Sequence, residues 1–261
     1  MVITDMKTFS ESYHTLTRGD IVVGLLNLKK NEEAKFLHLV ENGVKLFPSA
    51  LAQATSRSKA AQVYILGNVM VGYTFVARDK RDLIEQITNY NAHKIKEVVT
   101  KQDRLNCGLG INVWPSIEAV YNHASLGLME FPFVVQPFVK NVRDIRVIII
   151  GDYVEAYERI NQYNFRHNLY FGGESRPYTL SKKERAFCLR VMRKAHFPYA
   201  HIDLMLTNDK LYLSEINLRG GLKGSQIRPD KYIPLINKVH QDFVKRHLSS
   251  CSKSTSATKK A

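Results

Sequence analysis

The expected fold rests first on residues 144–159, which read DIRVIIIGDYVEAYER. Two runs rich in β-branched and aromatic residues, Ile145–Ile150 and Tyr153–Ile160, flank the pair Gly151-Asp152. A glycine-containing pair between two such runs is a strong signal for a two-residue turn. This stretch therefore predicts a β-hairpin.

Arg146 and Arg159 fall on one face of the predicted hairpin. A two-residue turn pairs Ile150 with Tyr153, and counting back along both strands puts the two arginines on the same side. Two guanidiniums on one face of a mostly apolar sheet repel each other unless an anion lies between them, and their planar forks suit phosphate or carboxylate oxygens. The alternative is ordinary ion pairing with acidic neighbours, namely Asp144, Glu155 or Glu158.

A second hairpin is expected over His201–Asn217, with its turn around Asn208-Asp209. Glu215 and Asn217 stand two residues apart and share a face, because side chains alternate along a strand. Asp203 joins them only if the connection has an odd length or the hairpin contains a bulge. Three converging oxygen ligands would suit Mg²⁺ held partly by substrate phosphates. With a strict two-residue turn, these would be ordinary polar side chains on separate faces.

The composition is that of a globular protein with an excess of positive charge. Of the 261 residues, 44% are hydrophobic and 24% charged, and the net charge is +14. No apolar run approaches the roughly 18 residues of a membrane span, and no secretory signal is recognisable. Three scattered cysteines indicate a reducing compartment, so we expect a cytoplasmic location. The charge fits a solvated basic surface or attraction of nucleotides; nucleic-acid binding is less favoured, because no Lys/Arg stripe with interleaved aromatics is present.

The expected elements favour α+β layers over a doubly wound sheet, because antiparallel hairpins are mixed with helices. A short β-α-β opening occupies residues 1–55, and helices and strands fill residues 56–248. Residues 249–261 have the composition of a disordered basic tail. Ser181 and Glu184 form a capping box that opens a further helix.

Weaker signals add little by themselves. Gly108-Leu109-Gly110 follows a strand that carries Lys101, and backbone N–H groups at such a turn can approach phosphates. His201 and Asp203 form a His-x-Asp unit, but no second cluster completes a metal site, so a core histidine is favoured. Walker-type and Gly-x-Ser-x-Gly motifs are absent, which argues against P-loop proteins and the commonest hydrolases.

Taken in chain order, these motifs resemble the ATP-grasp superfamily, especially its RimK-like glutamate-ligase branch. The resemblance covers roughly Ser56 to Ser225, about two thirds of the chain. It rests on Asp144-Ile145-Arg146, Gly151-Asp152, Glu158-Arg159, Phe165-Arg166-His167-Asn168-Leu169, Gly172-Gly173, Ile202-Asp203-Leu204, Glu215-Ile216-Asn217 and Gly221-Leu222-Lys223-Gly224.

The resemblance implies an α+β ATP-grasp fold, in which two α+β subdomains clasp ATP after a reduced β-α-β segment. Mg²⁺, or Mn²⁺ in its place, would be bound by Asp203, Glu215 and Asn217. Catalysis around the phosphates and the reacting carboxylate would fall to Arg146, Arg159 and Asn168. The residues assigned to the nucleotide are Lys59, Lys101, Gly108, Gly110, Gln136, Pro137, Phe138 and Val139.

The implied activity is ligation of a carboxylate to an amine through an acylphosphate, with release of ADP and phosphate. The partners would be ATP, an unidentified acid and an unidentified amine, either a small molecule or a protein. No membrane partner is expected, and the oligomeric state stays open. Two alternatives remain: an ATP-binding regulator or scaffold of the same fold, and a basic nucleic-acid-associated protein.

The chain departs from the family pattern beside the site. The phosphate-covering loop has fewer glycines than is usual, the region before Lys59 is short, and Leu218-Arg219-Gly220 replaces a stretch of small residues. Arg219 and Lys223 flank Gly220-Gly221, where the backbone can turn sharply. A guanidinium there suits a carboxylate, so we expect Arg219 to bind the acid substrate with help from Lys223. The alternative is a solvated loop arginine.

Overall fold

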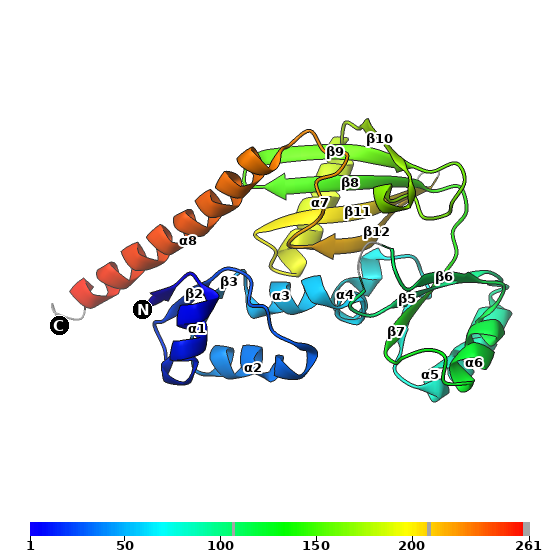
Figure 1. Cartoon of the computed structure of the whole chain (residues 1–261), viewed down its shortest axis with the longest axis horizontal. Helices are drawn as coiled ribbons and strands as arrows, with labels where there is room; N and C mark the ends of the chain where they lie inside the picture. Colours follow the sequence, from blue (N-terminus) through cyan, green and yellow to red (C-terminus); the bar gives the residue numbers. More distant parts are fainter. Residues whose placement is uncertain (106–107, 208–209, 258–261) are drawn as a thin grey trace.

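Three sheets and the helices around them build the protein (Figure 1). The computed structural model describes residues 1–105, 108–207 and 210–257. The first sheet has three parallel strands, whereas the second has four strands and the third has five, all antiparallel. Within the described ranges, no helix combines the length and apolar character needed to cross a membrane.

The N-terminal segment forms the parallel sheet. Its strands and helices are β1 (Val2–Ile3), α1 (Met6–Ser12), η1 (Tyr13–Thr15), β2 (Ile21–Val23), η2 (Lys30–Glu32), α2 (Ala34–Glu41) and β3 (Lys45–Phe47). The sequence predicted the β-α-β part but missed β1 and α1, because such short elements carry little periodicity. Phe9, Phe36 and Leu39 are buried in a separate apolar core of this segment.

The four-stranded sheet has the order β4-β7-β5-β6 and carries two helices. Its elements are β4 (Phe75–Ala77), α5 (Lys80–Ala92), β5 (Val98–Gln102), β6 (Ile111–Trp114), α6 (Ile117–Ser125) and β7 (Phe133–Pro137). Ser116 caps α6, since its side chain accepts from the Ala119 N–H. On α5, Leu83 and Tyr90 take the buried face, whereas Ile84 is 51% exposed.

The first predicted hairpin lies in the five-stranded sheet, whose order is β10-β9-β8-β11-β12. It consists of β8 (Arg143–Ile150) and β9 (Tyr153–Ile160), and Ile150 pairs with Tyr153 as expected. Asp144 lies opposite Arg159, and Arg146 stands two residues further along β8. The two arginines therefore share one face, which confirms the prediction from the turn.

The second hairpin contains the bulge that the sequence left open. Strands β11 (Tyr199–Thr207) and β12 (Lys210–Asn217) pair Leu204 with Leu213, yet Asp203 lies opposite Glu215. Ser214 is thus the extra residue of a β-bulge, which shifts the register by one. Thr207 pairs with Lys210, and the turn residues Asn208-Asp209 lie outside the described residues.

The remaining helices connect and cover the sheets. They are α3 (Ala50–Arg57), α4 (Lys59–Leu66), η3 (Gly67–Val69), η4 (Leu169–Phe171), α7 (Lys182–Lys194) and α8 (Pro229–Ala257), with β10 (Glu174–Pro177) at the sheet edge. The capping box of Ser181 and Glu184 opens α7 as predicted, whereas α3 was not anticipated.

Residues 249–261 were expected to form a disordered tail. Helix α8 begins at Pro229 and continues through Ala257, so it covers most of that segment. Residues 258–261 lie outside the described residues. In Figure 1 the helix runs from the five-stranded sheet towards the N-terminal segment, where Phe243 stacks on Phe47 with ring centroids 4.0 Å apart.

Candidate active site

A cleft of about 1010 Å³ is lined by strands of both the four-stranded and the five-stranded sheet. Lys101 comes from β5 and Gln136 from β7, whereas Arg146, Asp203 and Glu215 come from the larger sheet. The cleft brings together every predicted site residue except Lys59 and Gly110. Segments far apart in the chain therefore present their polar side chains to one space.

The anion between the two guanidiniums is a side chain of the protein. Arg146 donates through Nε and Nη2 to the two oxygens of Asp203, at 2.7 and 2.8 Å. Arg159 Nη2 lies 3.0 Å from Asp203 Oδ2 and donates to Asp144 Oδ1 at 2.6 Å. The structure thus shows the ion pairing that the sequence offered as an alternative, with Asp144 as one of the expected acidic neighbours and Asp203 as a further one.

Burial and charge act against each other in this cluster. Burial disfavours ionised Asp203, but Arg146 and Arg159 outweigh it and hold the pKa of Asp203 below its usual range. Burial raises the pKa of Asp144, and the charge of Asp203 adds to this effect while Arg159 opposes it. The Nε atom of Arg159 is buried without a hydrogen-bond partner in the described part of the chain. A buried donor of this kind is costly, and an anionic oxygen in the cleft would satisfy it.

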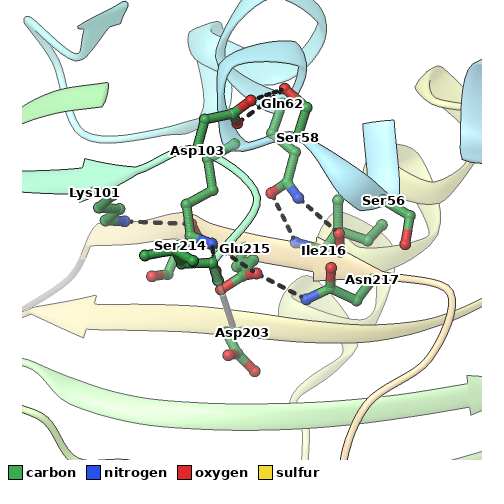
Figure 2. A network of polar contacts seen from close by, with 12 residues as sticks. Ser56, Ser58, Gln62, Lys101, Asp103, Asp203, Ser214, Glu215, Ile216 and Asn217 are labelled. Atoms are coloured by element: carbon green, nitrogen blue, oxygen red, sulfur yellow. Dashed lines mark hydrogen bonds and ion pairs between the residues drawn. The ribbon is translucent and has the colours of Figure 1, made fainter. Parts of the chain in front are cut away.

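Glu215 and Asn217 lie next to Asp203 on the neighbouring strand (Figure 2). Asn217 Nδ2 donates to Glu215 Oε1 at 3.0 Å, so the amide oxygen Oδ1 of Asn217 is not used in this contact. Lys59 Nζ is 3.8 Å from Glu215 Oε1, so Lys59 contacts this carboxylate although it does not line the cleft. Lys101 Nζ donates to the Ser214 carbonyl at 3.4 Å. Burial lowers the pKa of Lys101, and the charge of Glu215 partly offsets that.

Gln62 supports this strand, a role that the sequence analysis missed. Strand β12 is the edge of its sheet, so the Ile216 N–H and C=O need partners other than a further strand. Gln62 Nε2 donates to the Ile216 carbonyl at 2.9 Å, and Gln62 Oε1 accepts from the Ile216 N–H at 3.0 Å (Figure 2). The signal in the sequence is a glutamine inside the otherwise apolar run of α4.

Asp103 is a second residue that the sequence analysis missed. Its carboxylate accepts from Ser58 Oγ at 3.0 Å and from the Ala60 N–H at 3.1 Å, so it joins the end of β5 to the first turn of α4. Anionic groups are stabilised at helix N-termini by the unpaired N–H groups there. This contact fixes α4 beside the cleft and with it Lys59, whose Nζ also donates to the Leu105 carbonyl.

Both predicted loop glycines occupy positions that a side chain could not. Gly108 has a φ of +76°, and a Cβ there would lie 2.4 Å from Asn168 Nδ2. Gly110 has a φ of +69°, and its Cβ would lie 2.6 Å from Gln102 Cβ. Asn168 in turn caps η4 by accepting from the Phe171 N–H at 3.1 Å. The loop therefore approaches Asn168 closely, while Asn106 and Cys107 lie outside the described residues.

Arg219 and Lys223 both line the cleft and are exposed. Lys223 Nζ donates to the Leu169 carbonyl at 3.0 Å. Arg219 has no acidic side chain within ion-pair distance among the described residues. Among the described residues, Arg57 and Arg166 also line the cleft without an acidic partner, but they donate to backbone carbonyls.

His201 is a buried histidine of the sheet, as the sequence favoured. Its Nε2 lies 3.0 Å from the Tyr232 hydroxyl, and burial lowers its pKa to about 4. Over residues 1–105, 108–207 and 210–257, no group of three or more His, Cys, Asp and Glu side chains is placed to hold a metal ion. On this face the two carboxylates of Asp203 and Glu215 lie opposite each other, and the Asn217 amide lies beside Glu215.

Two facing sheets that present lysines, arginines and oxygen ligands to one cleft define the ATP-grasp class of fold. The chain belongs to the RimK-like ATP-grasp domain family, which it matches over residues 54–238. This finding agrees with the resemblance deduced from the ordered motifs.

The individual proteins that resemble this chain have low sequence identity to it or match only part of it. The chain is 32% identical over 102 residues to a probable alpha-L-glutamate ligase of Sodalis glossinidius (strain morsitans), covering 38% of this chain and 34% of that protein. It is 26% identical to the ribosomal protein bS6–L-glutamate ligase of Escherichia fergusonii, covering 67% of this chain and 59% of the relative. The chain thus spans less than two thirds of these relatives. A RimK-domain ATP-grasp protein of Sphaerobacter thermophilus shares the fold, with a TM-score of 0.56, 15% identity and coverage of 85% and 80% of the two chains.

Proposed function

We propose that the protein is an ATP-dependent carboxylate–amine ligase that forms ADP and an acylphosphate intermediate. The observation that carries this proposal is the cleft of a RimK-like ATP-grasp domain in which Arg146, Arg159 and Lys101 lie around Asp203 and Glu215. Positive groups beside hard oxygen ligands suit a triphosphate with its metal ion. No acid–base residue is needed for positioning and charge neutralisation.

The nucleotide would lie between the two sheets. Gln136, Pro137, Phe138 and Val139 line the cleft at the end of β7, where their backbone would meet the adenine edge. Gly108 and the cations Lys101 and Lys59 would be on the phosphate side. The unpartnered Nε of Arg159 supports this placement, because a phosphate oxygen would accept its hydrogen bond.

The residues around Glu215 fit a magnesium ion by the chemistry of their donors. Glu215 and the Oδ1 atom of Asn217 would hold it, and Asp203 would add an oxygen. A carboxylate has about four lone-pair positions, and the contacts of Asp203 with Arg146 and Arg159 use three of them. When bound, Mg²⁺ would neutralise phosphate charge and polarise the γ-phosphoryl group.

The chain would then position two successive displacements. A carboxylate oxygen of the acid forms a bond to the γ-phosphorus as the bond to the bridging oxygen breaks, and ADP leaves. Arg146 and Arg159 would stabilise the negative charge on the transferred group. The amine nitrogen next bonds to the acyl carbon, phosphate departs with the C–O electron pair, and the departing phosphate takes up the proton that the nitrogen loses as the amide forms. Arg219, with Lys223 and Asn168 nearby, would orient the acid.

The test is a matrix of carboxylic acids and amines, incubated with Mg-ATP and scored for ADP, phosphate and amide mass. We expect ADP and phosphate only when a matching acid and amine are both present. Calorimetry with Mg-ATP provides a separate measure of nucleotide binding, which Glu215→Gln should weaken at least tenfold. AMP and pyrophosphate as products, or no Mg-ATP binding by the wild-type protein, would contradict the proposal.

A further inference from the structure

A second cavity of about 610 Å³ adjoins the cleft, and the residues that line both are Leu25 and Arg219. Its walls come from the N-terminal segment, the start of β11 and helix α8. Much of this wall lies outside residues 54–238, which match the family. The second cavity is therefore built largely by the parts of this chain that the family domain does not include.

The walls of the second cavity are mainly apolar. Besides Leu25, the aliphatic side chains that line it are Met6, Val22, Val23, Leu26, Ile233 and Ile236. Tyrosines also line it, but they are already bonded: Tyr199 OH lies 3.0 Å from His240 Nε2, and Tyr232 OH lies 3.0 Å from His201 Nε2. Such walls favour an apolar body in the ligand.

Few charges face this space. Asp5 is occupied at the N-cap of α1, where it accepts from the Thr8 N–H at 2.9 Å. Burial lowers the pKa of His240, and the charge of Arg219 lowers it further, which favours the neutral imidazole. Arg219 is thus the cation at the boundary, without an acidic partner among the described residues. A guanidinium in this position suits a carboxylate.

We infer that the second cavity takes the apolar body of the acid substrate, a carboxylic acid with an aliphatic or aromatic tail whose carboxylate lies at Arg219. This inference rests on the proposed ligase function. The carboxylate would face the cleft, while the tail would lie between the N-terminal segment and α8. A second charge on the tail would be buried among aliphatic side chains without a cation to pair with it, which is unfavourable. The cavity thereby selects acids by the polarity of their tails.

The first test needs no nucleotide. Hexanoate, acetate, hexanol and L-glutamate are titrated into the full chain, and binding is followed by saturation-transfer NMR and calorimetry. Hexanoate should bind at least tenfold more tightly than each of the other three, because only hexanoate has both the carboxylate and the apolar tail. Equal affinities for hexanoate and acetate, or tighter binding of L-glutamate, would overturn the inference.

Substitutions in the second cavity test whether the apolar tail of the acid binds there. Ile236→Trp fills the cavity with an indole, and Lys238→Trp adds the same group on the exposed face of α8 as a matched control. Ile236→Trp should weaken hexanoate at least tenfold and leave acetate unchanged, whereas Lys238→Trp should change neither. Asn237→Phe, at an exposed position of the cavity lining, gives the same test if Ile236→Trp does not fold. Hexanoate binding that survives both cavity variants would refute the assignment.

Two further measurements distinguish this inference from the proposed function: the effect of removing the charge of Arg219, and the binding of Mg-ATP. Arg219→Met should weaken hexanoate at least tenfold while hexanol is unaffected. Mg-ATP affinity is measured on wild-type protein and on Ile236→Trp, and it should not differ between them, because Ile236 does not line the cleft. Failure of Mg-ATP to bind wild-type protein would count against the ligase alone, since hexanoate is measured without nucleotide. Normal Mg-ATP binding with no preference for hexanoate would count against the second cavity alone.

Discussion

Gln62 determines how firmly the edge strand β12 presents Glu215 and Asn217. Its side chain is buried and makes three hydrogen bonds, two to Ile216 and one of 3.2 Å to the Thr55 carbonyl. Ile216 stands between the two proposed metal ligands. Gln62→Leu keeps the size of the side chain but removes all three bonds.

The expected loss of stability follows from those bonds. A hydrogen bond contributes about 1 kcal/mol net, and a buried backbone group left without a partner costs about 1–3 kcal/mol. Gln62→Leu should therefore lower the free energy of unfolding by about 3 kcal/mol. The same substitution should make β12 more mobile at Ile216, between the two proposed metal ligands. We therefore expect the affinity for Mg-ATP to fall about tenfold, which corresponds to roughly 1.4 kcal/mol.

Urea unfolding measures the stability, calorimetry the Mg-ATP affinity, and hydrogen exchange the protection of the Ile216 amide. The matched control is Gln86→Leu, since Gln86 is on α5 away from the cleft and accepts one bond from Asn89. The control should change the unfolding free energy by less than about 0.5 kcal/mol. A loss under about 1 kcal/mol for Gln62→Leu, or unchanged protection at Ile216, would refute this role of Gln62.

Three further predictions concern the site and the core. Arg219→Ala should lower kcat/KM for the acid about ten- to hundredfold, because a charged hydrogen bond contributes roughly 1.5–3 kcal/mol. Steady-state kinetics with acid and ATP varied separately checks this prediction. A fall in kcat/KM for ATP alone would contradict it. Arg146→Met leaves Asp203 paired with Arg159 alone, so the free energy of unfolding, measured with urea, should fall by about 3–5 kcal/mol. An unchanged unfolding midpoint would argue against the ion pair between Arg146 and Asp203. Burial raises the pKa of Cys188 to about 12, so its protonated thiol is favoured in the folded protein. Its contribution to stability is full below the ordinary pKa of 9.0 and declines as pH rises from there towards 12. Iodoacetamide at pH 8 should therefore modify Cys188 only after unfolding, as read by peptide mass spectrometry; rapid modification of the folded protein would show the burial to be wrong.

The parts of the fold predicted from sequence are those with strong local patterns. The pair Gly151-Asp152 between two β-rich runs gave the register of β8 and β9, because a two-residue turn determines which residues face each other. The helix opened by Ser181 was predicted for the same reason, since a capping box is a local pattern. Helix α3 escaped notice although it is amphipathic, because it has only eight residues and its buried face consists of the small or polar side chains Ala52, Gln53 and Thr55.

The bulge at Ser214 marks the limit of that reasoning. The sequence indicated that Asp203 and Glu215 share a face only with an odd connection or a bulge, and nothing local decided between this and a strict two-residue turn. The structure has a bulge at Ser214, and β11 pairs with β8 on one side and with β12 on the other. Pairing with a third strand is a property of the whole sheet.

The sequence by itself determined the residue types of the site, their order and the face that Arg146 and Arg159 share. Only the tertiary structure decided that Asp203 lies between these guanidiniums, that Gln62 supports Ile216 and that Arg219 borders a second cavity. The physical reason is distance along the chain: Arg146 and Asp203 are 57 residues apart, and Gln62 and Ile216 are 154 apart. The periodicity of apolar residues along the sequence indicates local secondary structure. Contacts between distant residues depend instead on how helices and strands pack against one another.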